Sequence, residues 1–237
     1  MASSTITIEG RDGGAFAAYL AMPDRPNGAA IIVLQEIFGV NANIRAIAGD
    51  YAARGYIAVA PDLFWRLRPG VDLDPSDPAS REAAMVLMGQ FDPQKAIGDV
   101  LATAAHARGL PGSSGNIGVV GYCLGGKLAY FLAMQPGIDA AVSYYGTGIH
   151  GALDQAGSIA CPLLLHVAQE DNLCPPEAQA ALREALAPLS DRATIREYPG
   201  VGHAFARRGA ATCDAPSADR ADAATHAFFA DHLTARD

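Results

Sequence analysis

The chain alternates short apolar runs with longer segments in which apolar residues recur every three or four positions. Short apolar runs bounded by Gly, Pro, Asn or Asp are typical of buried strands, whereas a period of about 3.6 residues predicts an amphipathic helix. A polar turn at residues 11–14 separates the first two runs and predicts an opening hairpin. We therefore expect strands at residues 5–8, 15–21, 29–35, 56–60, 117–120, 140–144, 162–167 and 194–198.

Between these runs, the helical period predicts helices whose ends carry recognisable signals. Asn41 or Asn43 can cap the first helix, and Asp77-Pro78 is a cap followed by a proline at the first helical position. Strands that alternate with helices predict an α/β fold, with a mostly parallel central sheet and helices on both faces. No repeat or linker divides the chain, so we expect one domain over residues 1–237, with helices at 42–54, 78–89, 93–108, from 125 onward, within 176–186, and at 218–232.

Composition narrows the class of protein. Half of the 237 residues are hydrophobic and the net charge is −8, which disfavours nucleic acid as a partner because phosphates would be repelled. The first residues lack the charged and apolar regions of a signal peptide, and the longest apolar stretch, 29–34, is too short to span a bilayer. The four cysteines show no C-x-x-C spacing. We expect a cytoplasmic monomer without cofactor, metal or membrane partner.

A Gly-x-Cys-x-Gly motif follows the 117–120 run, where we expect the strand to break at Gly121. Gly121-Tyr122-Cys123-Leu124-Gly125 has the form of the G-x-S-x-G nucleophile elbow with cysteine in the serine position. Two other interpretations remain: a free cysteine is often a small buried hydrophobe, and residues 121–127 nearly form a phosphate-binding P-loop. The P-loop interpretation is weakened because Leu128 stands where Ser or Thr is needed.

Two further reactive residues fall just after predicted strands. Asp171 follows the 162–167 run and His203 follows the 194–198 run, so the order along the chain is nucleophile, acid, histidine. Glu170 is the nearest alternative to Asp171. His166 lies inside a predicted buried strand and is expected to be a core histidine with its hydrogen bonds satisfied; three others lie in predicted helices (His106, His226, His232).

Glu36 comes directly after the most apolar strand of the chain. Burial there would raise the pKa of its carboxyl and make it a usable proton acceptor. The alternative from position alone is a strand-end carboxylate that faces water.

Taken together, these motifs resemble the dienelactone hydrolase family, the carboxymethylenebutenolidases. The resemblance rests on Gln35-Glu36-Ile37-Phe38-Gly39, the cysteine motif, the Asp171 loop and Gly202-His203-Ala204-Phe205, which occur in the family's order from about residue 5 to 229. It implies an α/β-hydrolase fold and a metal-free triad of Cys123, His203 and Asp171.

The resemblance also implies roles for other residues. Glu36 would accept the thiol proton, the backbone N–H groups of Ile37 and Leu124 would form the oxyanion hole, and Arg81 and Arg207 would bind a substrate carboxylate. From the residues alone, Leu124 suits its role because helix N-termini carry unpaired N–H groups, and paired arginines bind carboxylates well.

Some positions depart from the family pattern. Met85 and Met88 occupy a helix face where family members often carry aromatic residues, and Ala204 stands where a hydroxyl residue is common. We expect both methionines to line the pocket, together with Phe38 and Tyr145; Tyr122 and Trp65 are further candidates.

The predicted function is hydrolysis of an enol-lactone that bears a carboxylate, such as dienelactone, which gives maleylacetate. A non-catalytic thiol protein that binds ligands or senses oxidants through Cys123 is the main alternative, and nucleotide binding through the incomplete P-loop is a weaker one.

Overall fold

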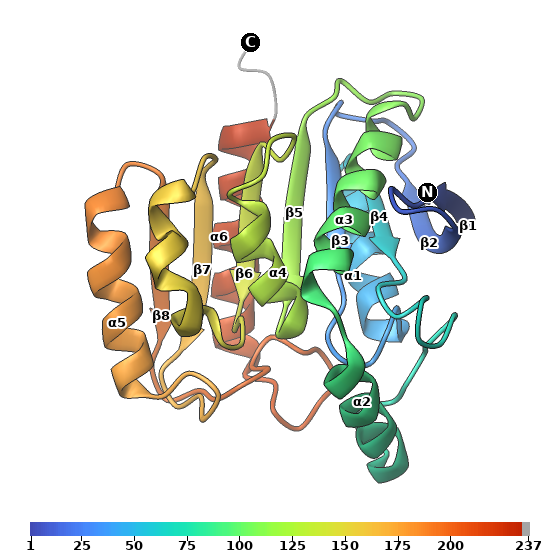
Figure 1. The fold of residues 1–237 in the computed structure, drawn as a ribbon. Helices are drawn as coiled ribbons and strands as arrows, with labels where there is room; N and C mark the ends of the chain where they lie inside the picture. The colour runs from blue at the N-terminus through green and yellow to red at the C-terminus, as the bar shows by residue number, and fades with distance from the viewer. Residues whose placement is uncertain (234–237) are drawn as a thin grey trace. The chain divides into compact units, whose positions relative to one another are not determined.

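The computed structural model describes residues 1–233, which form two compact units, residues 1–119 and residues 120–233. The described residues contain eight strands alternating with helices (Figure 1), as the hydrophobic pattern predicts. The expectation of one domain stays a prediction. None of the helices among residues 1–233 is long and apolar enough to cross a membrane.

The first unit is built on four strands in the order β1-β2-β4-β3. Strands β1 and β2 form the predicted antiparallel hairpin, β2 pairs antiparallel with β4, and β3 pairs parallel with β4. All five residues of β3 are buried, which explains its continuous apolar sequence. The elements of this unit are β1 Ala2–Glu9, β2 Ala15–Met22, β3 Ala30–Leu34, α1 Ala42–Ala53, β4 Ile57–Pro61, α2 Pro78–Gln90 and α3 Pro93–Arg108.

The helices of the first unit begin at the predicted caps. Asn41, rather than Asn43, accepts a hydrogen bond from the backbone N–H of Ile44 at the start of α1. Asp77 accepts one from Ser80 at the start of α2, where Pro78 takes the first helical position. Each cap satisfies an N–H group that has no acceptor inside its own helix.

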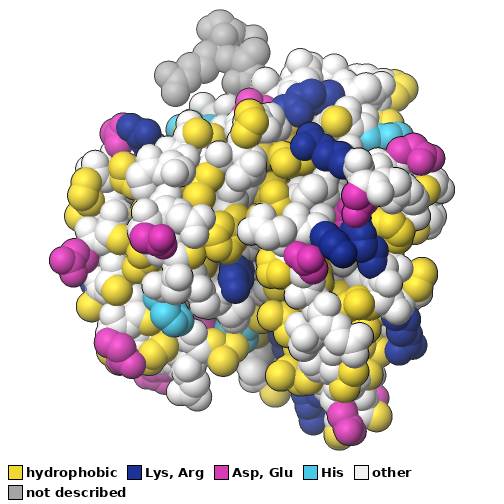
Figure 2. All heavy atoms as spheres, viewed as in Figure 1, with side chains coloured by type: hydrophobic (Ala, Val, Ile, Leu, Met, Phe, Trp, Pro, Cys, Tyr) yellow, Lys and Arg dark blue, Asp and Glu magenta, His cyan; other side chains and the backbone are white. Residues whose placement is uncertain are grey.

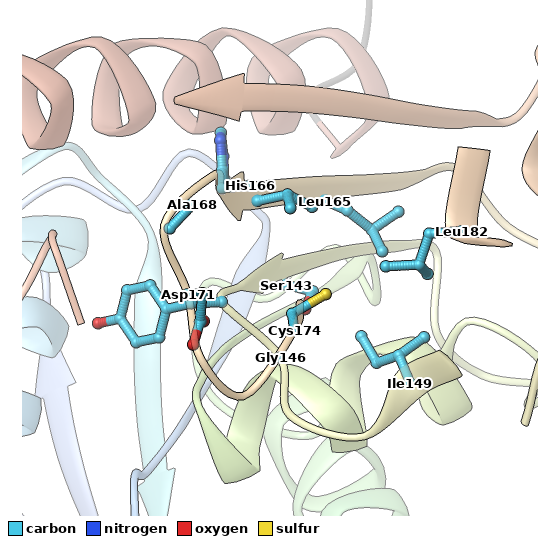
Figure 3. A pocket seen from close by; sticks show the side chains of 11 residues that line it. Ser143, Gly146, Ile149, Leu165, His166, Ala168, Asp171, Cys174 and Leu182 are labelled. Atoms are coloured by element: carbon cyan, nitrogen blue, oxygen red, sulfur yellow. The ribbon is translucent and has the colours of Figure 1, made fainter. Parts of the chain in front are cut away.

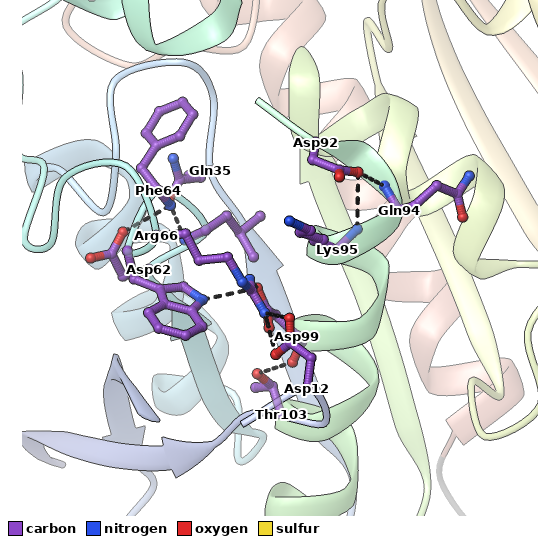
Figure 4. Close-up of polar contacts among 12 residues, drawn as sticks. Asp12, Gln35, Asp62, Phe64, Arg66, Asp92, Gln94, Lys95, Asp99 and Thr103 are labelled. Atoms are coloured by element: carbon purple, nitrogen blue, oxygen red, sulfur yellow. Dashed lines mark hydrogen bonds and ion pairs between the residues drawn. The ribbon is translucent and has the colours of Figure 1, made fainter. Parts of the chain in front are cut away.

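A polar cluster fixes the segment that follows β4 (Figure 4). Arg66 is paired with the buried Asp99 of α3 and, at 2.7 and 2.8 Å, with both carboxylate oxygens of Asp12 in the β1–β2 turn. The indole of Trp65 donates to Asp99 at 3.0 Å and stacks on Phe16. This cluster joins the hairpin, the post-β4 segment and α3, and no sequence motif had indicated it.

The second unit contains the strand order β5-β6-β7-β8, and strand β5 begins within the first unit. Strands β6, β7 and β8 are parallel. Figure 1 shows α4 in front of these strands and α6 behind them. The elements are β5 Ile117–Tyr122, α4 Leu124–Leu132, β6 Ala140–Tyr144, the 3₁₀ helix η1 Ile149–Ser158, β7 Leu163–Ala168, α5 Pro176–Leu186, the 3₁₀ helix η2 Ala187–Leu189, β8 Ala193–Tyr198 and α6 Ala215–Leu233.

Three details differ from the sequence expectations. Strand β5 does not break at Gly121 but continues to Tyr122, so the chain turns at Cys123 itself. Strand β4 begins at Ile57 because the N–H of Tyr56 donates to Tyr51 at the end of α1. The helix η1 was not predicted, although its apolar residues Ile149, Leu153 and Ala156 recur at helical spacing; its backbone is kinked at Ala152.

Candidate active site

Cys123 occupies a strained turn between β5 and α4. Its backbone has φ 54° and ψ −109°, a conformation that L-residues rarely adopt and that is often found at functional positions. A Cβ added to Gly121 would lie 1.9 Å from the carbonyl oxygen of Gly125, and one added to Gly126 would lie 2.7 Å from that of Tyr144. The glycines of the motif are therefore required by the close approach of backbone to backbone around Cys123.

His203 and Asp171 are joined within the second unit. A hydrogen bond of 2.8 Å links Nδ1 of His203 to Oδ2 of Asp171, and the other carboxylate oxygen accepts the N–H of Leu173 at 2.8 Å. Because an ionised carboxylate can only accept, Nδ1 carries the hydrogen. The Asp171 side chain is 2% exposed, so this ion pair is poorly screened by water. Glu170, the alternative acid, is exposed and does not take this position.

The electrostatics of His203 involve Cys123 directly. Burial alone would lower the pKa of His203, but the hydrogen bonds to Asp171 and Cys123 and the negative charges of both raise it to about 10. The Nε2 atom, which is not the ring nitrogen bonded to Asp171, is buried. An imidazole with one nitrogen fixed by a carboxylate and the other next to a cysteine has the geometry of a nucleophile–base–acid system.

Two other cysteines lie in environments that suppress reactivity. Burial raises the pKa of the Cys161 thiol to about 12, and burial together with the charge of Asp171 raises that of Cys174 to about 11. A thiol with so high a pKa is almost wholly protonated near neutral pH and is a poor nucleophile. Cys123 is buried to a similar extent and differs from these two cysteines in lying beside the imidazole of His203.

Asp171 also lines a small cavity between β6, β7 and α5 (Figure 3). Ser143, Gly146 and Cys174 are among its walls, and the Ser143 hydroxyl has no hydrogen-bond partner among residues 1–233. Its volume of about 10 Å³ is at the lower limit of what holds one water molecule. No part of a substrate fits there.

Tyr145 packs directly against the catalytic candidate. Its ring centroid lies 5.1 Å from that of His203 in an edge-to-face arrangement, and its backbone has a positive φ of 38°. The side chain is 3% exposed. Tyr145 therefore restricts the orientation of the imidazole. Its predicted role in lining a substrate pocket stays a prediction.

The other predicted site residues of the second unit are neighbours of Cys123 or His203 in the sequence. Leu124 is the first residue of α4, where backbone N–H groups lack acceptors inside the helix. Arg207 is half-buried in the turn after His203, and its N–H donates to Ala204 at 3.0 Å. Ala204 itself has a φ of 62°, so it adopts the left-handed conformation without a stabilising polar side chain.

Six predicted site residues belong to the first unit. Glu36 follows β3 and is only 1% exposed, so its predicted burial is confirmed. Ile37 lies in the next turn, half-buried, and Phe38 is 5% exposed. That these residues face Cys123 stays a prediction, as it does for Arg81, Met85 and Met88.

Helix α2 carries the last three of these residues. The Arg81 guanidinium donates to the carbonyl oxygens of Pro75 at 2.9 Å and Ser76 at 3.1 Å. Met85 is 61% exposed and Met88 is half-buried, so neither side chain is packed in a hydrophobic core. Hydrophobic side chains are visible over α2 at the lower right of Figure 2.

Comparison with known proteins covers almost the whole chain. A model of the dienelactone hydrolase family matches residues 16–233. Carboxymethylenebutenolidase 1 of Cupriavidus pinatubonensis is 35% identical over 225 residues, 95% of each chain, and the carboxymethylenebutenolidase of Pseudomonas putida is 37% identical over 207 residues, 87% of each chain.

A solved structure with a similar fold supports the match to the dienelactone hydrolase family. The crystal structure of a "putative dienelactone hydrolase" from Klebsiella pneumoniae subsp. pneumoniae MGH 78578 superposes with a TM-score of 0.84 at 27% identity, covering 98% of this chain and 99% of that one. The predicted α/β-hydrolase class is thereby confirmed. On the combined strength of the family match and these relatives, the chain belongs to the dienelactone hydrolase family and is a hydrolase of that type.

Proposed function

We propose that this enzyme opens an enol-lactone bearing a carboxylate, such as dienelactone, to maleylacetate, with Cys123 as nucleophile and His203 and Asp171 as its partners. The observation that carries the proposal is the arrangement of His203, which is bonded to Asp171 at 2.8 Å and interacts with Cys123 on its other side. The names of the relatives support the lactone, since a carboxymethylenebutenolide is a lactone with an acidic side group.

The first half of the proposed cycle acylates the cysteine. Glu36 accepts the proton of the Cys123 thiol, and the thiolate forms a bond to the ring carbonyl carbon. The N–H groups of Ile37 and Leu124 bind the resulting oxyanion, and one such donor is typically worth about 2.7–4 kcal/mol. The ring C–O bond then breaks, and the departing enolate takes a proton from the imidazolium of His203.

The second half depends on how the charge of Cys123 affects His203. The negative charge of Cys123 is one of the causes that raise the pKa of His203. Once the sulfur is acylated that charge is gone, so the pKa of His203 falls and the neutral imidazole can accept a proton from water. Hydroxide attack on the thioester releases the acid and the Cys123 thiolate, which takes its proton back from Glu36. Asp171 orients the ring throughout.

Arg81 and Arg207 are proposed to hold the substrate carboxylate. Guanidinium groups bind carboxylates with two parallel hydrogen bonds, which fixes orientation as well as charge. Replacing either arginine with alanine should raise KM for dienelactone and leave KM for p-nitrophenyl acetate, an uncharged ester, nearly unchanged.

The decisive experiment replaces the sulfur. Cys123→Ala should lower kcat for dienelactone and p-nitrophenyl acetate by at least about 10³-fold, because the nucleophile is lost. Cys161→Ala is the matched control, since this thiol is buried and kept protonated. Undiminished turnover in Cys123→Ala would exclude the assignment, and rapid alkylation of Cys123 without any ester turnover would favour a thiol-based binding protein instead.

A further inference from the structure

Gln35, the residue between β3 and Glu36, is completely buried in the first unit, with an exposed fraction of 0%. Its side-chain oxygen accepts the backbone N–H of Leu63 at 3.1 Å, and its side-chain nitrogen donates to the backbone carbonyl oxygen of Glu36 at 3.3 Å. Figure 4 shows Gln35 next to Asp62 and Phe64, which flank Leu63 in the chain. Glutamine is rarely buried so completely, and the proposed reaction gives this one no role.

The two hydrogen bonds allow only one orientation of the Gln35 amide. The N–H of Leu63 can only donate, and the carbonyl oxygen of Glu36 can only accept. The amide oxygen must therefore face Leu63, and the amide nitrogen must face Glu36. Turning the amide by half a turn would set donor against donor and acceptor against acceptor in a buried site, which is costly. The side-chain nitrogen of Gln35 is thus held against the Glu36 carbonyl.

The Glu36 carbonyl and the Ile37 N–H belong to the same peptide unit. This unit is planar and trans, so its C=O and N–H groups point in opposite directions. Fixing the direction of the carbonyl therefore fixes the direction of the N–H. If the peptide unit rotated between its two Cα atoms, the N–H would turn away and the hydrogen bond from Gln35 would be lost.

The residues that follow are fixed by a different segment. The N–H of Leu73 donates to the carbonyl oxygen of Phe38 at 3.0 Å. A Cβ added to Gly39 would lie 1.9 Å from the carbonyl oxygen of Val71, so the two backbones approach closely there. These contacts hold the chain after the peptide unit, and Gln35 is placed to set the orientation of the unit itself.

We propose that Gln35 is a positioning residue, whose side-chain nitrogen holds the Glu36–Ile37 peptide unit so that the Ile37 N–H donates to the oxyanion. The inference rests on the proposed function, in which this N–H is one of the two oxyanion donors. Such a donor stabilises the transition state because it is already oriented before the negative charge develops. Gln35 acts through the peptide unit and needs no contact with the substrate.

The test replaces the amide by an apolar side chain of similar length. Gln35→Met should lower kcat for p-nitrophenyl acetate by about 10²-fold, the lower end of what the loss of one oxyanion donor costs, with KM changed by less than about threefold. Phenyl trifluoromethyl ketone supplies a second readout. Its carbonyl carbon forms a bond to the sulfur of Cys123 while the carbonyl π electrons move to the oxygen, which gives an oxyanion without a leaving group. The inhibition constant of the ketone should rise by about the same factor as kcat/KM falls.

Alkylation separates a misplaced donor from a general disturbance. Iodoacetamide forms a carbon–sulfur bond with Cys123 and releases iodide, and no oxyanion arises, so this rate should change by less than about threefold in Gln35→Met. Thr103→Val is the matched control in the same unit. Thr103 is also 0% exposed, and its hydroxyl donates to the carbonyl oxygen of Asp99 at 2.8 Å. This variant loses a buried hydrogen bond but should leave kcat, the inhibition constant and the alkylation rate within about threefold of wild type.

Gln35→Asn is a milder second variant for the case that Gln35→Met does not fold. Its amide is one methylene shorter and cannot bridge Leu63 and Glu36, so kcat/KM should fall and the inhibition constant should rise together by about tenfold. If turnover depends on Cys123 but the folded Gln35 variants change no more than Thr103→Val, the positioning role is wrong. It is also wrong if alkylation slows as much as turnover, or if the inhibition constant stays at the wild-type value. Full turnover in Cys123→Ala would instead overturn the proposed function.

Discussion

Two histidines of the second unit show how the same side chain is adapted to opposite tasks. His166 lies in the core between β7, β8 and α6, and its two ring nitrogens are bonded to Tyr198 and Thr225, each at 2.8 Å. His203 lies in the loop after β8, and its Nδ1 is bonded to Asp171, also at 2.8 Å. The lengths of these hydrogen bonds are the same, so the difference lies in the partners.

The partners decide the charge of each ring. Neutral hydroxyl groups supply no negative charge to offset the cost of burying an imidazolium, so burial, with a smaller contribution from the charge of Arg196, lowers the pKa of His166 to about 3. A carboxylate and a cysteine outweigh burial at His203 and raise its pKa to about 10. A histidine with both nitrogens satisfied by neutral groups is structural, whereas one with a carboxylate on one side and a cysteine on the other is suited to proton transfer.

Removing the carboxylate should produce the largest effect. In Asp171→Asn the partner of His203 is neutral, as in the His166 environment, and the imidazolium formed during the reaction loses its stabilising charge. We expect kcat for p-nitrophenyl acetate at pH 7 to fall by about 10³- to 10⁴-fold. Glu177→Gln, at an exposed position in the first turn of α5, is the control. A loss smaller than tenfold would show that Asp171 does not tune His203.

Replacing the core histidine should affect stability and spare catalysis. His166→Leu has a similar volume but leaves the buried Tyr198 hydroxyl without its partner, so the free energy of unfolding in urea should decrease by about 2–4 kcal/mol. The kcat per folded molecule should change by less than about threefold. His150→Leu, at an exposed position, should stay within about 0.5 kcal/mol of wild type. Lost activity with unchanged stability would contradict the structural role.

The smallest effect, per pH unit, is the change of stability with pH, which has two different origins. The folded-state pKa of His203 is raised to about 10, so its contribution is fully present below about pH 6.5 and is lost as the pH rises toward 10. The folded-state pKa of His166 is lowered to about 3, so stability falls as the pH drops below about 6.5. Each slope is at most about 1.4 kcal/mol per pH unit.

Urea unfolding from pH 5 to pH 9 measures both slopes, and the variants separate them. His166→Leu should flatten the acid side, and Asp171→Asn should flatten the alkaline side, because each removes one of the two pKa shifts. Identical changes on both sides in both variants would mean that the two histidines do not titrate independently.

Most helices and strands, and the candidate residues that follow the strands, could be predicted from the sequence, because they depend on residues close together in the chain. The apolar runs determined which segments become strands, and Asp77-Pro78 determined where α2 begins. The glycines around Cys123 determined the elbow, since no Cβ fits at Gly121. Reactive residues just after strands are necessarily close to one edge of a parallel sheet, which is why Cys123, Asp171 and His203 could be selected together.

Other features were decided only by tertiary structure. Whether Glu170 or Asp171 faces His203 depends on how the loop after β7 folds, and adjacent residues of a loop point in different directions. The Arg66 cluster joins Asp12 and Asp99, which are 87 positions apart. The sequence therefore determined the elements and the candidate chemistry of this protein. The tertiary structure alone determined the partner of each titratable group, because a pKa is fixed by neighbours in space and by burial, not by neighbours in sequence.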